Sequence, residues 1–337
     1  MSGTLIQIVP GLEPYGGVAS HARTLARALE EQAALRTRFV APRHDGADAA
    51  ERLHRELASG DGAPVLLHYS NYGYDRRGCP RWLLAALEHW RQQRPNARLV
   101  TVFHEVYATG RPWQSSFWLS PVQRRLAARL RRLSDHAVTS LELYRDLLRQ
   151  WNDGEVVTLP VFSTVGEPPA PAALGRRRRR LVVFGSPGLR ARAYTSARRE
   201  LQRACAALEV EEIADAGPAI ALPATFAGIP VRRLGEQPAE AISDLLADSV
   251  AGFLSYPPAL VAKSTVFAAY AAHRMVPVCA WPNGRPSNAA GVDDGHERLW
   301  DGTRRRAEWQ QIADAAHAWY QGHPLARHTA AYAELLR

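Results

Sequence analysis

Along the first half of the chain, short runs of aliphatic and β-branched residues alternate with longer amphipathic stretches. The runs have the length of strands, whereas the stretches repeat apolar residues on one helical face, as Val18, Ala22, Leu25 and Leu29 do. We expect strands at 5–9, 37–41, 64–70, 98–104, 136–141 and 155–161. Helices are expected from residue 18 onward and at 47–58, 81–90, 121–133 and 142–150.

The same alternation restarts at residue 180. Strands are expected at 180–184, 210–214, 230–234, 250–256 and 275–280, with a loop over 185–193. Helices are expected at 194–208, 238–247 and 262–273, and in a tail over 307–337 that breaks at Gly322-His323-Pro324. Such alternation builds βαβ units, whose right-handed crossovers cover both faces of a parallel sheet. The predicted fold class is α/β: two Rossmann-like, doubly wound parallel-sheet domains that face each other across a cleft, where a ligand binds.

Residues 166–180, GEPPAPAALGRRRRR, interrupt the alternation. Pro and Ala without an apolar period bury no face, and five consecutive arginines repel one another, so we expect a solvated linker. It separates a first domain at 1–165 from a second at 181–318, with a last helix at 319–337. The arginine run is also compatible with nucleic-acid binding, but no aromatic residues are interleaved for base stacking, which favours the linker.

Charge and composition narrow the class of protein. The 337 residues include 42 basic and 33 acidic ones, a net charge of +9, and Lys263 is the only lysine among them. This excess favours anionic partners: phosphates, nucleic acid or an acidic membrane surface. There is no apolar run long enough for a transmembrane helix and no signal-peptide pattern. Three scattered cysteines, Cys79, Cys205 and Cys279, frame neither a disulfide scaffold nor a zinc site, so we expect a cytoplasmic protein.

Two loops of the first domain carry candidate chemistry. Gly16 and Gly17 precede a helix, where backbone N–H groups can approach a phosphate or sugar, although a plain tight turn fits equally well and neither GxGxxG nor a P-loop is present. His104 and Glu105 end the fourth expected strand, at the rim of the cleft. The alternative for His104 is an ordinary surface histidine, and HEVYA is not a zincin motif.

Two loops of the second domain could hold an anion. Gly185 opens a strand-to-helix connection that also carries Arg190 and Arg192, so backbone donors, a helix dipole and guanidinium groups would meet there. Arginine is abundant everywhere in the chain, which weakens that interpretation. Lys263, Ser264 and Thr265 begin a helix, and a lone lysine suggests a position that needs a compact ammonium, unless it survived by chance.

A basic amphipathic helix is expected at 121–133, with Ser120 as N-cap and Pro121 in the first turn. Trp113, Phe117 and Trp118 precede it, and its arginines lie largely off the apolar stripe. This pattern is typical of a helix at an anionic membrane interface, and a core-packed helix with a solvated basic face fits it equally well.

Taken in order, these motifs resemble those of GT-B glycosyltransferases, and most closely those of glycosyltransferase family 4, the retaining nucleotide-sugar-dependent group. The resemblance covers nearly the whole chain and rests on Gly16-Gly17-Val18, Phe103-His104-Glu105, the passage from Ala271 to Pro277-Val278, and the closing WYQGHPLARHTAAYAELL. It implies that the last helix crosses back onto the first domain. It also implies that His104 lies beside the transferred sugar.

The resemblance further assigns roles around the donor. Gly16 and Gly17 would touch the donor phosphate, Arg190 or Arg192 would neutralise the diphosphate, and Ser264 and Thr265 would hold it. We therefore expect catalytic roles for His104, Lys263 and Arg190. The donor-binding residues are expected to be Gly16, Gly17, Gly185, Arg190, Arg192, Lys263, Ser264 and Thr265. The acceptor side is expected to include Tyr15, Glu105, Asn71 and Trp113.

One departure from the family is clear. Family 4 members carry two glutamates eight positions apart, and the corresponding positions here are Ala262 and Tyr270. Donor hydroxyls would then be held otherwise, for example by Lys263, or the donor differs, or activity is reduced. No DxD motif occurs, so no metal is expected, and Asp293-Asp294 fit a solvated turn.

The sequence thus predicts a metal-independent, retaining transferase that moves a hexose from a nucleoside-diphosphate sugar, its co-substrate, to a hydroxyl of a glycan, glycolipid or small molecule, without another cofactor. Its site in the cell is expected to be the cytoplasm, with peripheral contact of 112–133 with an anionic inner membrane face. The alternatives are a non-catalytic nucleotide-sugar-binding partner subunit and, on charge alone, a nucleic-acid binder; we expect no nucleic-acid partner.

Overall fold

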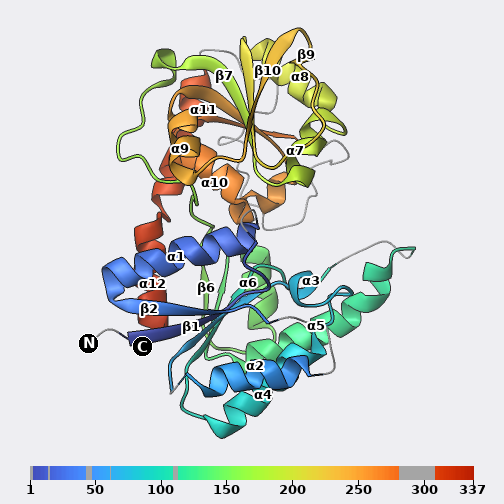
Figure 1. The fold of residues 1–337 in the computed structure, drawn as a ribbon, viewed down its shortest axis with the longest axis vertical. Coiled ribbons are helices and arrows are strands. Elements are labelled where there is room, and N and C mark those ends of the chain that lie inside the picture. Colours follow the sequence, from blue (N-terminus) through green and yellow to red (C-terminus); the bar gives the residue numbers. More distant parts are fainter. Residues whose placement is uncertain (1–2, 14–15, 43–47, 61, 109–112, 281–307) are drawn as a thin grey trace. The chain divides into compact units, whose positions relative to one another are not determined.

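The computed structural model describes residues 3–13, 16–42, 48–60, 62–108, 113–280 and 308–337. The chain forms two compact units, Met1–Pro160 with Leu325–Arg337, and Val161–Pro324. Each unit is an α/β layer structure around one six-stranded sheet (Figure 1).

The first unit contains a sheet whose strands all pair in parallel. Its order is β2-β1-β3-β4-β5-β6, so the order reverses once, between β1 and β3. Strands β3 and β4 are buried at every position because helices cover both faces of the sheet. The strands are β1 (Gly3–Ile8), β2 (Leu35–Val40), β3 (Val65–Tyr69), β4 (Leu99–Phe103), β5 (His136–Thr139) and β6 (Val156–Thr158).

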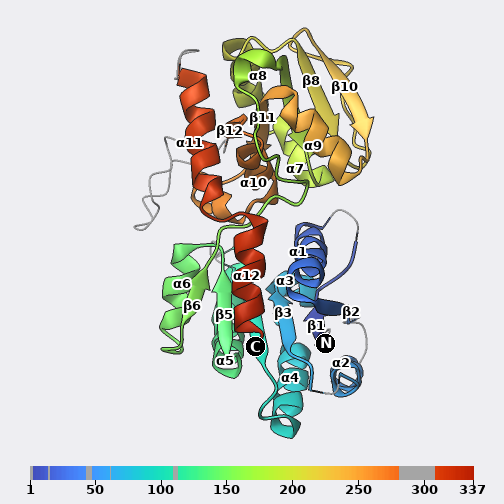
Figure 2. The same cartoon turned by 90° about the vertical axis from the view of Figure 1, so that its left-hand side faces the viewer.

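Helices of the first unit form two layers. Helix α1 packs against α12 on one face, and α2, α4 and α5 pack together on the other (Figures 1 and 2). The C-terminal helix α12 is thus part of the unit formed by the N-terminal half of the chain. The helices are α1 (Gly17–Ala33), α2 (Ala49–Ala58), α3 (Asn71–Tyr74), α4 (Arg81–Gln93), α5 (Ser115–Leu133), α6 (Glu142–Arg149) and α12 (Leu325–Leu335).

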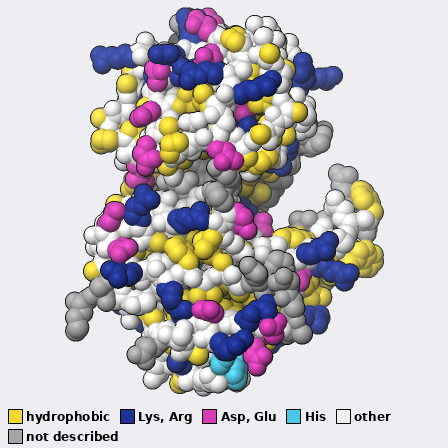
Figure 3. Space-filling view, viewed as in Figure 1, with side chains coloured by type: hydrophobic (Ala, Val, Ile, Leu, Met, Phe, Trp, Pro, Cys, Tyr) yellow, Lys and Arg dark blue, Asp and Glu magenta, His cyan; other side chains and the backbone are white. Residues whose placement is uncertain are grey.

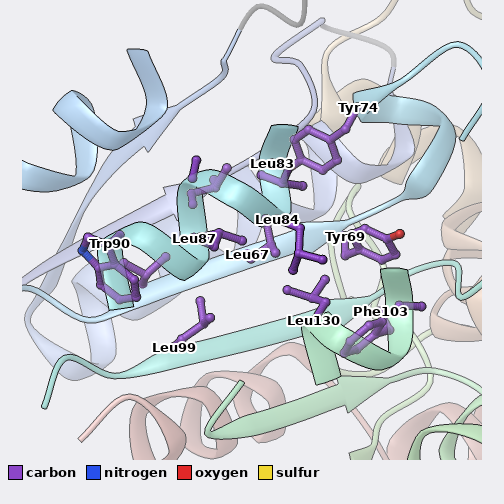
Figure 4. Close-up of a cluster of buried hydrophobic side chains, with 14 of the residues drawn as sticks. Leu67, Tyr69, Tyr74, Leu83, Leu84, Leu87, Trp90, Leu99, Phe103 and Leu130 are labelled. Carbon is purple, nitrogen blue, oxygen red and sulfur yellow. The ribbon is translucent and has the colours of Figure 1, made fainter. Parts of the chain in front are cut away.

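The core of the first unit lies between the sheet and α4. Leu84 and Leu87 of α4 point toward Leu67 of β3, while Trp90 lies over the start of β4 (Figure 4). These side chains are almost completely buried, and burying each leucine contributes about 1.5–3 kcal/mol. Because alternate strand residues face opposite layers, His68, the neighbour of Leu67, faces the α1 side instead.

The second unit has the sheet order β12-β11-β7-β8-β10-β9, parallel except for the edge pair β9 and β10. The order reverses once, between β7 and β11. Its strands are β7 (Arg178–Phe184), β8 (Glu212–Ala216), β9 (Thr225–Phe226), β10 (Ile229–Gly235), β11 (Ser249–Ser255) and β12 (Val276–Ala280). Its helices are η1 (Leu174–Arg176), α7 (Pro187–Tyr194), α8 (Arg198–Ala207), α9 (Ala239–Ala247), η2 (Pro258–Lys263), α10 (Thr265–Ala272) and α11 (Trp309–Gln321).

The segment expected to be a solvated linker is part of the second unit. The Leu174 amide donates to Gln310 Oε1 (2.8 Å), and the Tyr320 hydroxyl donates to Glu167. Two of the five arginines are buried: Arg177 donates to backbone carbonyls, and Arg180 pairs with Glu212. The prediction that all five stay in solvent is wrong for these two, because β7 already begins at Arg178 and draws the run against the sheet.

Three other element predictions differ from the structure. The expected loop at 185–193 contains α7, a helix of its own, and the helix expected at 194–208 is α8, which begins only at Arg198. Helix α5 begins at Ser115, so Pro121 lies inside it and Ser120 is not its N-cap. A proline there leaves the Phe117 carbonyl without its helical donor, which solvent on that exposed side can replace. The break at 322–324 separates α11 from α12, as expected.

None of the helices in the described part of the chain combines the length and the apolarity needed to cross a bilayer.

The packing of β11 against α10 yields a stability prediction. A Cβ at Gly252 would lie 2.3 Å from the ring of Tyr270, which is fully buried. Gly252→Ala should therefore lower the free energy of unfolding by about 1–3 kcal/mol, because the ring has no room to move. Gly175→Ala is the control, since no described atom lies within 4 Å of its Cβ position. Urea denaturation of both variants is the measurement, and equal stability of the two would contradict this packing.

Candidate functional site

In the second unit, Gly185 brings the loop after β7 against the first turn of α10. Its φ is +120°, a conformation that L residues rarely adopt, and a Cβ there would lie 3.2 Å from Val266 Cγ2 and 3.3 Å from Leu189 Cδ2. The loop therefore requires glycine both for its backbone conformation and for close packing. This contact sits at the point where the strand order reverses, the usual ligand position of a doubly wound sheet.

Two helices begin at this point. Helix α7 starts at Pro187, directly after the Gly185 loop, and α10 starts at Thr265 on the neighbouring connection. Ser264 caps α10, since its Oγ accepts a hydrogen bond from the Phe267 amide (3.2 Å). The first amides of each helix have no partner within the helix, and both helix dipoles place positive potential there. Backbone donors at two helix N-termini are the kind of groups that bind anions in proteins.

Lys263, Ser264 and Thr265 directly precede Val266, the residue that packs against Gly185. Lys263 is the half-buried last residue of η2, and Thr265 is the half-buried first residue of α10. The backbone of η2 is held in place because the Ser264 amide donates to the Val261 carbonyl (2.9 Å). Lys263 places a compact positive charge in the segment that leads into α10.

Arg190 does not provide a charge for a ligand. It is buried, its Nε donates to Asp215 Oδ1 (3.0 Å), and its Nη1 donates to the Pro218 carbonyl (2.5 Å). The Tyr194 hydroxyl donates to the other Asp215 oxygen (3.0 Å), so the carboxylate is satisfied on both sides. Burial, together with this carboxylate, raises the pKa of Tyr194 far above its usual value. The expected diphosphate contact of Arg190 is wrong, because this ion pair holds its guanidinium inside the unit. Arg192 is exposed on α7.

Tyr270, at one of the two positions where family 4 has a glutamate, is a core residue. The single hydrogen of its hydroxyl is shared between the carbonyls of Val182 on β7 (3.0 Å) and Phe253 on β11 (3.1 Å). Burial raises its pKa far above the usual value. It thus ties together the two strands beside the reversal. Ala262, the other position, lies in η2, and its carbonyl accepts from Val161.

In the first unit, Gly16 and Gly17 open α1 without steric need for glycine. Gly16 has a φ of −82° and occupies the N-cap position without a side-chain cap, and a Cβ there would make only ordinary contacts. No described atom lies within 4 Å of the Cβ position of Gly17. The described part of the fold therefore leaves open volume at this helix N-terminus, which is what the approach of a ligand would need.

His104 ends a chain of polar side chains that runs through the sheet. Gln7 donates to Thr37 Oγ1 (3.1 Å), which turns its Oε1 toward His68 Nε2 (2.9 Å). His68 then carries its proton on Nε2, so its Nδ1 accepts from His104 Nε2–H (3.1 Å). This row of polar side chains fixes both the orientation and the tautomer of His104. In the neutral His104 ring, Nδ1 is then the nitrogen that accepts a hydrogen bond.

Two further histidines surround this chain. The ring centroid of His21, on α1, lies 5.4 Å from that of His104 and 6.3 Å from that of His328, on α12. Burial, and secondarily the neighbouring histidines, lowers the pKa of His21 well below its usual value, and burial likewise lowers the pKa of His68. The pKa of His328 falls to about 4, also through burial. His21, His68 and His328 therefore stay neutral near pH 7.

Of the residues expected on the acceptor side, two lie on the loops near His104. Glu105 is half-buried and accepts from Ser70 Oγ (3.0 Å). Asn71 is buried and donates to Gln123 Oε1 (3.1 Å), so it fixes the start of α3 against α5. Trp113 is separate from these two, exposed just before α5. Tyr15 lies outside the described residues, as do Asp293 and Asp294.

Sequence reasoning missed Gln7 and His68. Gln7 lies between Ile6 and Ile8, His68 follows Leu67, and both polar residues are fully buried. Such a residue must find a buried partner, which is the signal that could have revealed the chain. Within the described ranges, no group of three or more His, Cys, Asp and Glu side chains is arranged to hold a metal ion, the histidine cluster included.

No protein-family model and no curated protein matches the sequence. Solved structures do match along the whole chain. An alpha-glucosyltransferase in complex with UDP-glucose and DNA containing an abasic site is 11% identical, with a TM-score of 0.58 over 99% of both chains. Alpha,alpha-trehalose 6-phosphate synthase from Burkholderia multivorans is 13% identical, with a TM-score of 0.59 over 100% of this chain and 98% of that one.

A third similar structure, from Listeria monocytogenes, is assigned as a UDP-N-acetylglucosamine 2-epimerase. It is 12% identical, with a TM-score of 0.52 over 98% of this chain and 94% of that one. The likeness establishes the fold: two parallel-sheet α/β domains of six strands each, as in GT-B structures. The predicted fold class is confirmed.

The neutral histidines predict a loss of stability in acid. Unfolded histidine takes up a proton near pH 6.5, whereas folded His328 does so only near its pKa of about 4. The unfolded state therefore binds more protons as the pH falls below 6.5, and each such histidine lowers the free energy of unfolding by about 1 kcal/mol between pH 7 and 5.5.

His328→Gln should reduce that loss by about 1 kcal/mol in urea denaturation at the two pH values, because glutamine keeps a donor for the Pro160 carbonyl but does not titrate. The exposed His89→Gln is the matched control and should leave the loss unchanged. An unaltered pH dependence in His328→Gln would show that this histidine is not held neutral.

Proposed function

We propose that the chain is a glycosyltransferase similar to family 4, which moves a hexose from a nucleoside-diphosphate sugar to a hydroxyl acceptor with retention and without a metal. The observation that carries the proposal is the pairing of the Gly185 loop with the capped start of α10 at the strand reversal of the second unit. The alpha-glucosyltransferase structure with UDP-glucose supports it by fold, and the donor class by analogy.

Departure of the nucleoside diphosphate builds negative charge on its terminal phosphate. In the proposed reaction the first-turn amides of α7 and α10 and the Lys263 ammonium stabilise that charge. These groups are fixed before the bond breaks, so little reorganisation accompanies the charge. Arg190 then acts indirectly, since its ion pair with Asp215 holds α7 against β8.

The first unit supplies the acceptor side in this proposal. Gly16 and Gly17 leave volume for the sugar or phosphate at the start of α1. His104, held by His68, presents Nδ1 as an acceptor for a hydroxyl hydrogen of the sugar. Gln7 and His68 are positioning residues, because they act only through His104.

A second candidate function is a nucleotide-sugar-binding protein without transferase activity. The burial of Tyr270 favours it, since no carboxylate reaches the donor from that position. This second function would be supported if the protein bound a nucleoside-diphosphate sugar but transferred its sugar to none of a set of glycan, lipid and small-molecule acceptors. Conversion of the nucleotide sugar without any acceptor would instead indicate an epimerase.

Lys263→Ala should weaken nucleoside-diphosphate binding by roughly 10- to 150-fold, since a hydrogen bond between charged groups contributes about 1.5–3 kcal/mol. Lys263→Arg should restore only part of the affinity, because the planar guanidinium does not replace a compact ammonium. Calorimetric titration with UDP and the other nucleoside diphosphates is the measurement. The control is Arg199→Ala, which removes an exposed positive charge on α8. Equal affinity of the Lys263 and Arg199 variants would remove Lys263 from the site.

His104→Ala should lower kcat by roughly 100-fold or more while leaving nucleoside-diphosphate affinity unchanged, because its hydrogen bond acts on the sugar during transfer. Gln7→Leu should lower kcat less and alter its pH profile, because the tautomer of His68 is then no longer fixed. Steady-state kinetics measures kcat for each variant. NMR of the product shows whether the anomeric configuration of the donor sugar is retained. An unchanged kcat in His104→Ala would refute the proposed roles of His104 and of the polar side chains Gln7 and His68 behind it.

A further inference from the structure

Helix α5 carries an exposed aromatic tip, defined here as Trp113, Phe117 and Trp118. These side chains are 75%, 42% and 70% exposed, and they are three of the five large apolar side chains that are exposed in the described part of the chain. The rings of Phe117 and Trp118 lie edge to face, 5.3 Å apart. Burying such aromatic area against water-free surroundings is strongly favourable, so a cluster of this kind indicates an interaction surface.

Arginines continue the same face along the helix. At 3.6 residues per turn, Phe117, Trp118, Arg124, Arg125 and Arg132 lie on the side opposite the buried Leu126 and Leu130. Figure 3 shows hydrophobic and arginine side chains together on the projecting part of this unit. The helix sequence, SSFWLSPVQRRLAARLRRL, contains no acidic residue to offset the charge.

The arginines border a pocket of about 350 Å³, lined by Arg124, Arg125, Arg132, Tyr107, Pro121 and Trp151 among others. The Arg124 guanidinium lies 5.9 Å from the centre of the Trp151 ring, which holds it at the pocket rim. Among the described residues, neither Arg124, Arg125 nor Arg132 forms an ion pair, whereas Arg129 on the adjacent face pairs with Glu88. The pocket therefore combines an aromatic wall with three positive charges that no described carboxylate neutralises.

We propose that this face of α5 docks the protein on a bilayer of anionic phospholipid. The aromatic tip enters the interfacial region, and the arginines of the pocket bind lipid phosphate groups. Tryptophan prefers this region of a membrane because its ring is apolar and its N–H reaches polar headgroups. Two signals, aromatic insertion and basic attraction, act together from one rigid helix.

The arrangement favours a membrane over nucleic acid. A single-strand binder alternates aromatic and basic side chains along a groove, so that each base stacks while its phosphate is neutralised. Here the aromatic side chains gather at one end of the helix and the arginines follow it. That separation matches the depth gradient of a bilayer, with hydrocarbon below and phosphates above.

The connection of α5 places the tip at a particular edge of the sheet. Helix α5 follows β4 after the His104 loop, so the first turn of α5 lies at the carboxyl edge of the sheet and projects beyond it (Figure 1). A bilayer that received the tip would therefore face the edge of the first unit that carries His104. Docking does not depend on transferase activity.

Co-sedimentation with vesicles of phosphatidylcholine, with and without phosphatidylglycerol, tests the proposal. Wild-type protein should pellet with the anionic vesicles and be released by salt. Changing Arg124, Arg125 and Arg132 to glutamine should weaken binding on the order of 100-fold, since each basic residue contributes about fivefold at such a surface. The double variant Trp113→Ala, Trp118→Ala should weaken vesicle binding roughly tenfold or more. Tryptophan emission of the wild-type protein should shift to the blue on binding, and that of the double variant should not.

Matched controls separate this face from charge and apolarity in general. Arg27, Arg199 and Arg203 are exposed elsewhere, and their change to glutamine should leave vesicle binding within about threefold of wild type, because charges off the contact face act only at long range. Leu143→Ala removes another exposed apolar side chain and should have no effect. Circular dichroism of each variant reports folding.

Equal losses in the face and control triples would overturn the proposal, because binding would then follow net charge alone. The proposal would also be overturned if the α5 variants lost binding to duplex DNA or RNA but kept their binding to vesicles. Nucleotide binding is measured without vesicles. If the wild-type protein bound no nucleoside diphosphate, the proposed function would be refuted and this inference would still stand.

Discussion

The reversal of strand order beside β7 is the constraint on which the second unit depends. Strands β7 and β11 are neighbours, but the chain leaves them in opposite directions, so α7 and α10 start on opposite faces of the sheet at one shared edge. Gly185 permits the approach, because any side chain there would meet Val266. The proposed anion site would consist mainly of backbone amides, whose direction is fixed by the topology, and Lys263 would add its charge to the field of the two helix dipoles.

Buried polar pairs support both candidate sites and explain why the charge of the chain is a poor guide to them. Arg190 joins Asp215 and Tyr194 inside the second unit, and Arg131 is buried in the first, where it donates to the Gly154 carbonyl (2.6 Å). A planar guanidinium with five donors suits such roles, and breaking one of these pairs would leave a buried charge without a partner. A basic composition therefore reflects internal architecture as well as attraction to anions.

Continuous apolar runs made the strands predictable, and parallel topology made the loops after them predictable as sites. Gly185 and Lys263 were selected as candidates in this way. The role of Arg190 was not, because a loop position says nothing about which way a side chain points, and an unexpected helix, α7, turns it inward. His68 was overlooked because a single polar residue in a strand is compatible with an exposed position. Its burial follows only from the fact that both faces of the sheet are covered, which the structure shows. The burial of Arg180 was not predicted either, because it depends on the exact residue at which β7 begins.

Tyr270 shows how far the donor site departs from the family it resembles. Its ring occupies the space above Gly252, and its hydroxyl joins two carbonyls across the strand reversal, so a glutamate there would bury a carboxylate beside two acceptors. The position is committed to holding β7 and β11 together. In the proposed function, recognition of the donor hydroxyls would then come from the first turn of α10 and the η2 segment, whose Ala262 carbonyl already accepts from the Val161 amide. In this chain the position that corresponds to a family 4 glutamate stabilises the strand reversal. In the proposed function, Lys263, immediately before the Ser264 cap, would take over the donor contact that this position does not make.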